Sequence, residues 1–330
     1  MSNLPIRGIL MRKSVTALLA SLPFAVSASG EVNPFIINGT DASVQNFPSI
    51  VNLYLDAFEY NQQYGSLFCG GTTLNESYVL TAAHCVDDRT DVHLFTKVVP
   101  QLQYRTDYPS NVTRHQVSEI YIHPGWDSNT SKNDIAILKL ESPRNIDVNN
   151  VAIKRPTNKN YATSGTSFVT IGHGLTNDST KTTSNTLQQT ELTYVDAATC
   201  GSAFTNTTID QTQLCTTGAF NPNTQRYNSA CSGDSGGPVY INSGSKNIQV
   251  GITSFGHSTC GFLPQTTTVF TDVYEYRSWI DSVLAGSVSP SFTSTHDKRL
   301  AFFGGSTSSG GAIGIFALLG MFLFGFTRRK

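Results

Sequence analysis

The sequence predicts an all-β protein built from short strands and many turns. Its 330 residues include 27 glycines and 13 prolines spread along the chain, as short strands joined by turns require. Runs typical of strands occur at residues 49–55, 68–74, 135–140 and 249–254. Apolar residues make up 39% and charged residues 14%, enough for a core and too little charge for a disordered chain. The length allows one large all-β unit or two smaller domains.

The six cysteines form an even set that indicates disulfides and an oxidising compartment. Their spacing alone leaves several pairings open, and the absence of a CxxC motif argues against a zinc site. The formal net charge of −1 gives no reason to expect nucleic acid as a partner. We expect no cofactor and no metal ion, with a calcium-binding loop in residues 87–116 as the open alternative.

The amino-terminal residues 1–28 are typical of a signal peptide. Basic residues Arg12 and Lys13 precede an apolar run over residues 15–26, and small residues follow at the expected cleavage site near Ala28. A membrane anchor is the alternative, but the apolar run is too short to span a bilayer.

A serine flanked by glycines stands in residues 231–238, CSGDSGGP. Glycine lacks a Cβ, so the backbone can bend sharply here and approach a substrate closely. Such a turn exposes the hydroxyl of Ser235 and can aim the amides of Gly233 and Ser235 at one point, where an oxyanion is stabilised. The alternative is an ordinary polar turn, because Ser, Gly and Asp are common turn residues.

A serine hydroxyl is a weak nucleophile and needs a base, which in turn needs a group to orient it. His84 in the run TAAHC follows a strand-like segment, and Asp134 in NDIAIL stands at the head of an apolar strand. Taken alone, His84 could be a packed core residue and Asp134 a turn residue. The order His84, Asp134, Ser235 is far more specific.

These motifs resemble those of the trypsin/chymotrypsin-like serine proteases, which carry their catalytic triad in this chain order. The resemblance covers residues 36–285. It implies two six-stranded antiparallel β-barrels, roughly residues 36–155 and 156–272. A helix at 272–285 follows and is expected to pack on the second barrel; apolar residues at helical spacing also indicate it.

The resemblance also assigns roles. It implies that Ser235 is the nucleophile, His84 the general base and Asp134 the group that orients His84. The amides of Gly233 and Ser235 then form the oxyanion hole. The implied disulfides are Cys69–Cys85, Cys200–Cys215 and Cys231–Cys260.

Activation by proteolysis is a further implication of the resemblance. Residues 29–35 then form a short propeptide, and the new α-amine of Ile36 pairs with the carboxylate of Asp234. The residue before the cut is Phe35, where many members have Arg or Lys, so the usual trypsin-type activator does not fit.

By resemblance, the substrate pocket has Ser229 at its floor, with Ser254, Phe255, Gly256 and Thr268 around it. Ser229 carries no charge, and burying a substrate ammonium against it would be costly. We therefore expect cleavage of protein or peptide substrates after large apolar residues, with protein inhibitors as further partners.

The composition changes after the predicted helix. Residues 286–311 are rich in Ser, Thr and Gly, as in a flexible linker, and residues 312–330 form an apolar tail with a basic end. The tail fits membrane attachment through a transmembrane segment or a GPI signal, and the alternative is a docking or expendable peptide.

Six Asn-X-Ser/Thr sequons fit a secreted glycoprotein. Asn38 lies too close to Ile36 to be expected to carry a glycan, which leaves Asn75, Asn111, Asn129, Asn177 and Asn206. A non-catalytic protease homologue that acts as a binding module is the rival function. An esterase is disfavoured, because α/β-hydrolases carry their triad in the order Ser, acid, His.

Overall fold

The structure is a computed structural model of the chain and describes residues 36–304, except residues 63, 178, 205–207 and 244–245. The predicted signal peptide (1–28), propeptide (29–35) and hydrophobic tail (312–330) lie outside the described residues. Within the described part, no helix has the length and apolar content that a membrane crossing requires.

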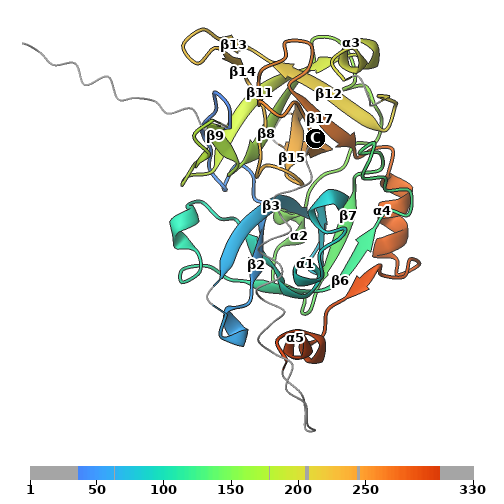
Figure 1. Ribbon diagram of the computed structural model, residues 1–330. Coiled ribbons are helices and arrows are strands. Elements are labelled where there is room, and N and C mark those ends of the chain that lie inside the picture. The colour runs from blue at the N-terminus through green and yellow to red at the C-terminus, as the bar shows by residue number, and fades with distance from the viewer. Residues whose placement is uncertain (1–35, 63, 178, 205–207, 244–245, 305–330) are drawn as a thin grey trace, which may run out of the picture. The chain divides into compact units, whose positions relative to one another are not determined.

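Strands dominate the described chain and close into two antiparallel barrels (Figure 1). The first barrel has the order β6-β5-β2-β3-β4-β7 and closes through the pairing of β6 with β7. Its strands are β2 (Ile50–Asp56), β3 (Gly65–Thr73), β4 (Tyr78–Thr81), β5 (Thr96–Pro100), β6 (His115–Ile122) and β7 (Ala136–Leu140).

The second barrel has the order β11-β12-β17-β16-β15-β8 and closes through the pairing of β11 with β8. Its strands are β8 (Ser167–Gly172), β11 (Gln188–Val195), β12 (Gln213–Gly218), β15 (Pro238–Ser243), β16 (Lys246–Phe255) and β17 (Thr268–Asp272). The predicted pair of six-stranded antiparallel barrels is confirmed for the described residues.

Shorter helices and strands connect or extend the barrel strands. Two-residue strands extend each one: β1 (Thr40–Asp41) pairs with β11, and β18 (Phe292–Thr293) pairs with β6. The remaining elements are β9 (Leu175–Asn177), β10 (Thr182–Thr183), β13 (Phe220–Asn221), β14 (Arg226–Tyr227), α1 (Thr90–Phe95), α2 (Val148–Val151), α3 (Ala197–Gly201), α4 (Arg277–Leu284) and α5 (His296–Phe302), with 3-10 turns at Phe58–Tyr60, Ala83–Cys85 and Arg105–Asp107.

The helix expected at 272–285 begins later, at Arg277, and its buried face belongs to the core of the first barrel, a cluster that Ile252 of the second barrel also joins. Ile280 and Val283 of α4 are fully buried in a cluster that includes Val79 and Leu138 of that barrel. The error arose because the helix follows the second barrel in the sequence, whereas its apolar face is buried against strands that are distant along the chain.

The predicted flexible linker is wrong for its first part. Residues 291–294 run along β6, with the amides of Ser291 and Ser294 donating to the carbonyls of Ile120 and Ser118 at 2.8 Å each. Helix α5 follows, and its N-terminus is capped by the Thr295 side chain, which accepts from the Lys298 amide. A Ser/Thr-rich composition thus masked a short strand and a capped helix.

Three disulfides join Cys69 to Cys85, Cys200 to Cys215 and Cys231 to Cys260, the pairing that the resemblance implied. The first links β3 to the turn that carries His84. The third links the turn that carries Ser235 to the segment after β16. Closing loops of these lengths typically stabilises a fold by about 2–4 kcal/mol each.

Candidate active site

The turn at residues 231–237 depends on glycine at two positions. Gly233 has φ +98° and Gly236 has φ +75°, both in the left-handed region that favours glycine. A Cβ on Gly236 would lie 2.2 Å from Thr81 Oγ1, so the turn also needs glycine to fit against the first barrel. The carbonyl of Ser235 accepts the Gly70 amide at 2.7 Å, which fixes the serine beside β3.

His84 and Asp134 are brought together by the first barrel alone. Strands β4 and β7 pair with Thr81 opposite Ala136, so the residues just outside this pair are neighbours. Asp134 Oδ1 accepts the His84 amide at 2.9 Å, and Asp134 Oδ2 lies 2.7 Å from His84 Nδ1. Two bonds to one carboxylate fix both the backbone and the ring of His84.

Asp134 is 1% exposed and is held by the second barrel as well. Ser254 Oγ, at the end of β16, donates to Asp134 Oδ2 at 2.5 Å, and Thr271 Oγ1, in β17, donates to the Asp134 carbonyl at 2.7 Å. The carboxylate therefore links the two barrels and is supplied with the donors that a buried charge requires.

The environment of His84 favours a basic imidazole. Burial lowers the pKa of His84, but the hydrogen bond and the charge of Asp134 outweigh it, with a further contribution from Asp87, so the pKa is raised above 6.5. With Nδ1 donating to Asp134, Nε2 is left as the atom that can take up a proton.

Ser235 and His84 line the same small cavity, of about 220 Å³, together with Phe68 and the first disulfide. The hydrogen bonds of the described residues do not include one between Ser235 Oγ and His84 Nε2. Such bonds are often long in free enzymes and tighten when substrate binds.

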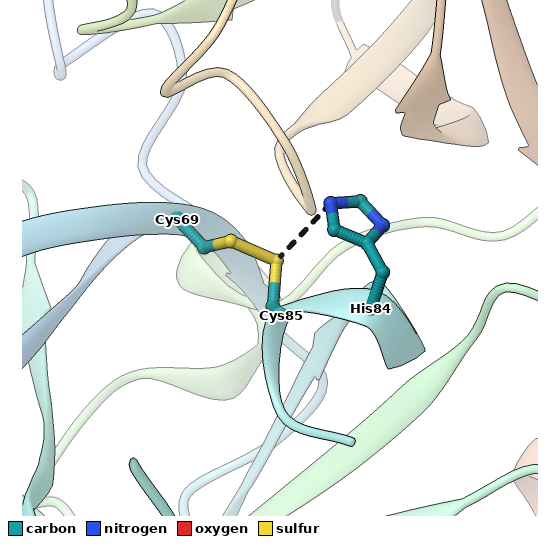
Figure 2. A group of neighbouring side chains, drawn as sticks. All are labelled: Cys69, His84 and Cys85. Carbon is teal, nitrogen blue, oxygen red and sulfur yellow. Dashed lines mark hydrogen bonds between the residues drawn. A yellow bond between two sulfur atoms is a disulfide. The ribbon is translucent and has the colours of Figure 1, made fainter. Parts of the chain in front are cut away.

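Figure 2 shows what faces His84 Nε2 instead: the Sγ atom of Cys85, at 3.8 Å. Cys69, His84 and Cys85 place three potential metal-ligating atoms close together. The two sulfurs are joined in a disulfide, however, and metal binding by cysteine needs a free thiolate.

The amides of Gly233 and Ser235 donate to no acceptor among the described residues, whereas the neighbouring amides of Asp234, Gly236 and Gly237 all donate to carbonyls. Two free amides on one turn, next to the half-buried Ser235 hydroxyl, are what a developing oxyanion needs.

Asp234 is buried behind the turn. Its carboxylate accepts the amides of Gly174 at 2.8 Å and Cys231 at 2.9 Å. Burial dominates over these two bonds and raises the pKa of Asp234 to about 7. Ile36 is fully buried, and no hydrogen bond or ion pair joins it to Asp234 in the described part of the uncleaved chain.

A larger cavity, of about 580 Å³, lies beside Ser235, and its lining includes Ser254, Phe255, Gly256 and Thr268. Ser229, expected at the floor of the substrate pocket, is fully buried and does not itself line this cavity. Its hydroxyl donates to the Ala230 carbonyl at 2.6 Å.

Comparison with known proteins agrees with this geometry. The family model described as Trypsin matches residues 36–280. The chain belongs to the trypsin family. It is 30% identical over 285 residues to chymotrypsin-like elastase family member 1 of Felis catus, covering 84% of this chain and 100% of that one.

Two further relatives come from insects. The chain is 31% identical to a chymotrypsin of Phaedon cochleariae, with 76% of this chain and 84% of the relative covered. It is 30% identical to CLIP domain-containing serine protease B4 of Anopheles gambiae, with 79% and 73% covered. The protein is a serine endopeptidase of the trypsin family, and its disulfides fit the secretory pathway.

Sequence reasoning missed several residues around this trypsin-family site. A Cβ on Gly172 or Gly174 would lie 2.0 Å or 2.5 Å from atoms of the Asp234 carboxyl group, so both glycines make room for it. The run GHG was a usable signal for close backbone approach. Thr271 carried no such signal, because its contact with Asp134 depends on how the two barrels meet.

Proposed function

We propose that this endopeptidase cleaves peptide bonds through an acyl-enzyme formed on Ser235. Ser235 Oγ attacks the scissile carbonyl carbon while His84 Nε2 takes its proton. The amides of Gly233 and Ser235 bind the oxyanion. The C–N bond then breaks as His84 passes the proton to the leaving amine. A water molecule then attacks the acyl carbon while His84 Nε2 takes its proton. The bond between the acyl carbon and Ser235 Oγ breaks as His84 returns the proton to Oγ, which releases the carboxylic acid and restores the Ser235 hydroxyl.

The observation that carries this proposal is the 2.7 Å contact between His84 Nδ1 and the buried Asp134 Oδ2, together with the cavity that His84 and Ser235 both line. It leaves Nε2 as the only ring nitrogen of His84 able to accept the serine proton, and Asp134 stabilises the imidazolium that results.

A serine-directed fluorophosphonate probe tests the assignment. We expect labelling of the secreted enzyme at Ser235 and none in Ser235→Ala or after heat denaturation. Ser232→Ala, which removes another hydroxyl of the same turn, serves as the matched control and should label normally. If the native enzyme fails to label while its barrels are folded, the non-catalytic binding module becomes the better account.

For specificity, we propose cleavage after large apolar residues. The 580 Å³ cavity has no acidic residue in its described lining, so a substrate lysine or arginine finds no counter-charge there. Thr268 narrows one wall. A panel of peptides differing only in the residue before the cut tests this, and dominant cleavage after Arg or Lys would refute it.

For activation, we propose that cleavage of the Phe35–Ile36 bond frees an α-amine that pairs with Asp234. Among the described residues, the buried carboxylate has only neutral amide donors, so a cation would complete its environment. Because Phe35 suits an apolar pocket, the enzyme can process its own precursor. Ser235→Ala precursor mixed with traces of active enzyme should gain Ile36 as a new terminus.

For localisation, we propose secretion through a signal peptide at residues 1–28, glycosylation, and surface attachment through residues 312–330 by a transmembrane segment or a GPI anchor. Asn111, Asn129 and Asn177 are exposed, which supports glycan acceptance. Asn38 donates to the Arg226 carbonyl at 3.0 Å, which supports its being unoccupied. Mass spectrometry of the mature protein, with its termini and glycopeptides, tests all three.

A further inference from the structure

The segment after α4 forms one wall of a groove of about 820 Å³. The rest of the lining comes from the residues that follow the His84 turn, Asp87 and Asp88, and from Thr90, His93 and Leu94 of α1. The wall from the carboxy-terminal segment includes Pro290, Phe292, Ala301 and Phe302. This volume lies in the range of sites that bind a few residues of peptide or a small ligand.

The groove continues into the site of chemistry. Asp87 and Asp88 line both the groove and the 220 Å³ cavity that holds His84 and Ser235. A chain that lies across Ser235 in this direction therefore passes the two aspartates and then meets the carboxy-terminal segment.

The direction follows from the two cavities that meet at Ser235. Under the proposed function, the 580 Å³ cavity beside Ser254–Gly256 holds the residue before the cut. The cavity on the side of the Cys69–Cys85 disulfide is then left for the residues after the cut. The groove beyond it lies on the leaving-group side of the substrate.

The near end of the groove has unbalanced negative charge. Asp88 is exposed, and within the described part of the chain Asp87 accepts only from the neutral Trp126 Nε1, at 2.8 Å. Arg89 does not neutralise them, because its guanidinium pairs with Asp91, Nη2 to Oδ2 at 2.5 Å.

The far end combines apolar side chains with the polar Ser291 and Thr293 and one cation. The Phe292 ring stacks on His93 with centroids 3.6 Å apart, and Phe302 packs edge-on against Phe95 at 5.4 Å. Both phenylalanines remain half-buried. The cation, Lys298, bonds through Nζ to the carbonyl and hydroxyl of Thr293.

The far wall is fixed in place before any ligand arrives. Arg299 is 3% exposed and donates to Ser294 Oγ at 2.8 Å, Tyr60 OH at 2.7 Å and Glu141 Oε1 at 3.0 Å. A preformed wall spares a ligand the entropy cost of ordering it.

We propose that this groove binds the substrate on the leaving-group side of the scissile bond, and that it favours a basic residue close to the cut followed by an apolar residue. The proposal rests on the serine-protease mechanism given above and adds a second determinant of specificity. Continuity with the Ser235 cavity identifies the occupant as substrate, and the charge and apolar walls define its chemistry.

The first test uses quenched fluorescent peptides that share one sequence before the cut. Lys, Gln or Glu is placed in turn at each of the first three positions after it. The enzyme is prepared from the full chain by secretion and processing, and its concentration is determined by active-site titration. At one or more positions, kcat/KM should be about two- to fivefold higher for Lys than for Glu, which is the effect expected of an exposed ion pair. The preference should grow at low ionic strength.

Asp88→Asn should bring this Lys-to-Glu ratio toward one. Asp297→Asn removes the same charge from exposed α5, outside the groove lining, and should leave the ratio unchanged. An unchanged ratio in Asp88→Asn, or a native preference for Glu, would overturn the proposal.

The second test blocks the far end. Ala301 is an exposed groove residue of α5, so Ala301→Arg fills the groove without disturbing the core. It should lower kcat/KM severalfold for peptides with four or more residues after the cut and leave a short substrate with a chromogenic leaving group unaffected. Ala285→Arg, at an exposed position outside the groove lining, is the matched control.

The short substrate distinguishes a failure of the proposed protease mechanism from a failure of the groove proposal. If Ser235→Ala and native enzyme act on it equally, the proposed function fails. If only the native enzyme cleaves the short substrate, but kcat/KM for the longer peptides depends neither on the charge of the residues after the cut nor on Ala301→Arg, only the groove proposal fails.

Discussion

Ser254 Oγ donates to Asp134 Oδ2 at 2.5 Å, so a residue of the second barrel completes the environment of an acid that belongs to the first. The same oxygen lies 2.7 Å from His84 Nδ1. The electrostatics of the imidazole are thus set where the barrels meet.

Replacing Ser254 by alanine should lower kcat/KM on the order of tenfold, because a hydrogen bond to a charged group is lost. With one donor fewer, Asp134 stabilises the His84 imidazolium more strongly. The acid limb of the pH–rate profile should therefore move to higher pH. A limb that moves to lower pH would contradict the role given to this bond.

Asp134→Asn should have a much larger effect, a loss on the order of 10⁴ in kcat, because an amide cannot hold the productive tautomer of His84. The barrels should stay folded, as measured by circular dichroism. Asp127→Asn, on an exposed loop nearby, should change kcat little.

The pH dependence should follow deprotonation of His84. Its pKa is raised above 6.5, so kcat/KM should fall as the pH drops below that raised value. Asp87 contributes to the rise, so Asp87→Asn should shift the acid limb to lower pH. A profile of the variant that coincides with that of the native enzyme would exclude a contribution from Asp87.

The uncleaved chain should lose stability as the pH rises. Folding raises the pKa of Asp234 from 3.8 to about 7, so the folded chain binds more protons than the unfolded chain between these values. This contribution is fully present below about pH 4 and is lost through pH 7, a cost on the order of 4 kcal/mol. The free energy of unfolding of the Ser235→Ala precursor, measured by urea denaturation, should fall over this pH range. Adding Asp234→Asn should make that free energy depend less on pH.

Gly174→Ala should impair activity, because its Cβ would lie 2.5 Å from the Asp234 carboxyl carbon and displace the group. We expect a loss of at least tenfold in kcat/KM with the fold retained. Gly201→Ala is the matched control, since no described heavy atom lies within 4 Å of its added Cβ. Equal activity of the two variants would argue against the importance of the Asp234 position.

Arg299→Ala should destabilise the protein by about 2–3 kcal/mol, because Tyr60, Ser294 and Glu141 lose a charged donor. Arg89→Ala, at a position more than half exposed, should change the free energy of unfolding by less than about 0.5 kcal/mol. Denaturant unfolding of the two variants provides the comparison.

The sequence predicted what local patterns encode. Strand runs, glycines at the Ser235 turn and the motifs around His84 and Asp134 were visible because each depends on neighbouring residues. The pocket floor was less predictable, because the burial of Ser229 behind the lining depends on the Thr267 carbonyl and the Thr268 hydroxyl, which are distant along the chain.

The carboxy-terminal segment was mispredicted for a physical reason. Its stability comes from distant partners, such as Ile120 for β18 and Glu141 for Arg299, and not from its own helix or strand propensity. The packing of α4 on the first barrel was missed for the same reason. Composition alone cannot distinguish a free linker from one that finds such partners.

The attachment of β18 and α5 also determines how this enzyme bears mechanical load. A pull on the chain beyond residue 304 reaches α5 and the Arg299 contacts first, then the two-residue pairing with β6. Tension is thus delivered to the barrel that carries His84 and Asp134, while the Ser235 turn is loaded only through the interface between the barrels. Enzyme immobilised experimentally through its carboxy-terminus and exposed to flow should therefore lose the carboxy-terminal wall of the groove before its catalytic residues are displaced.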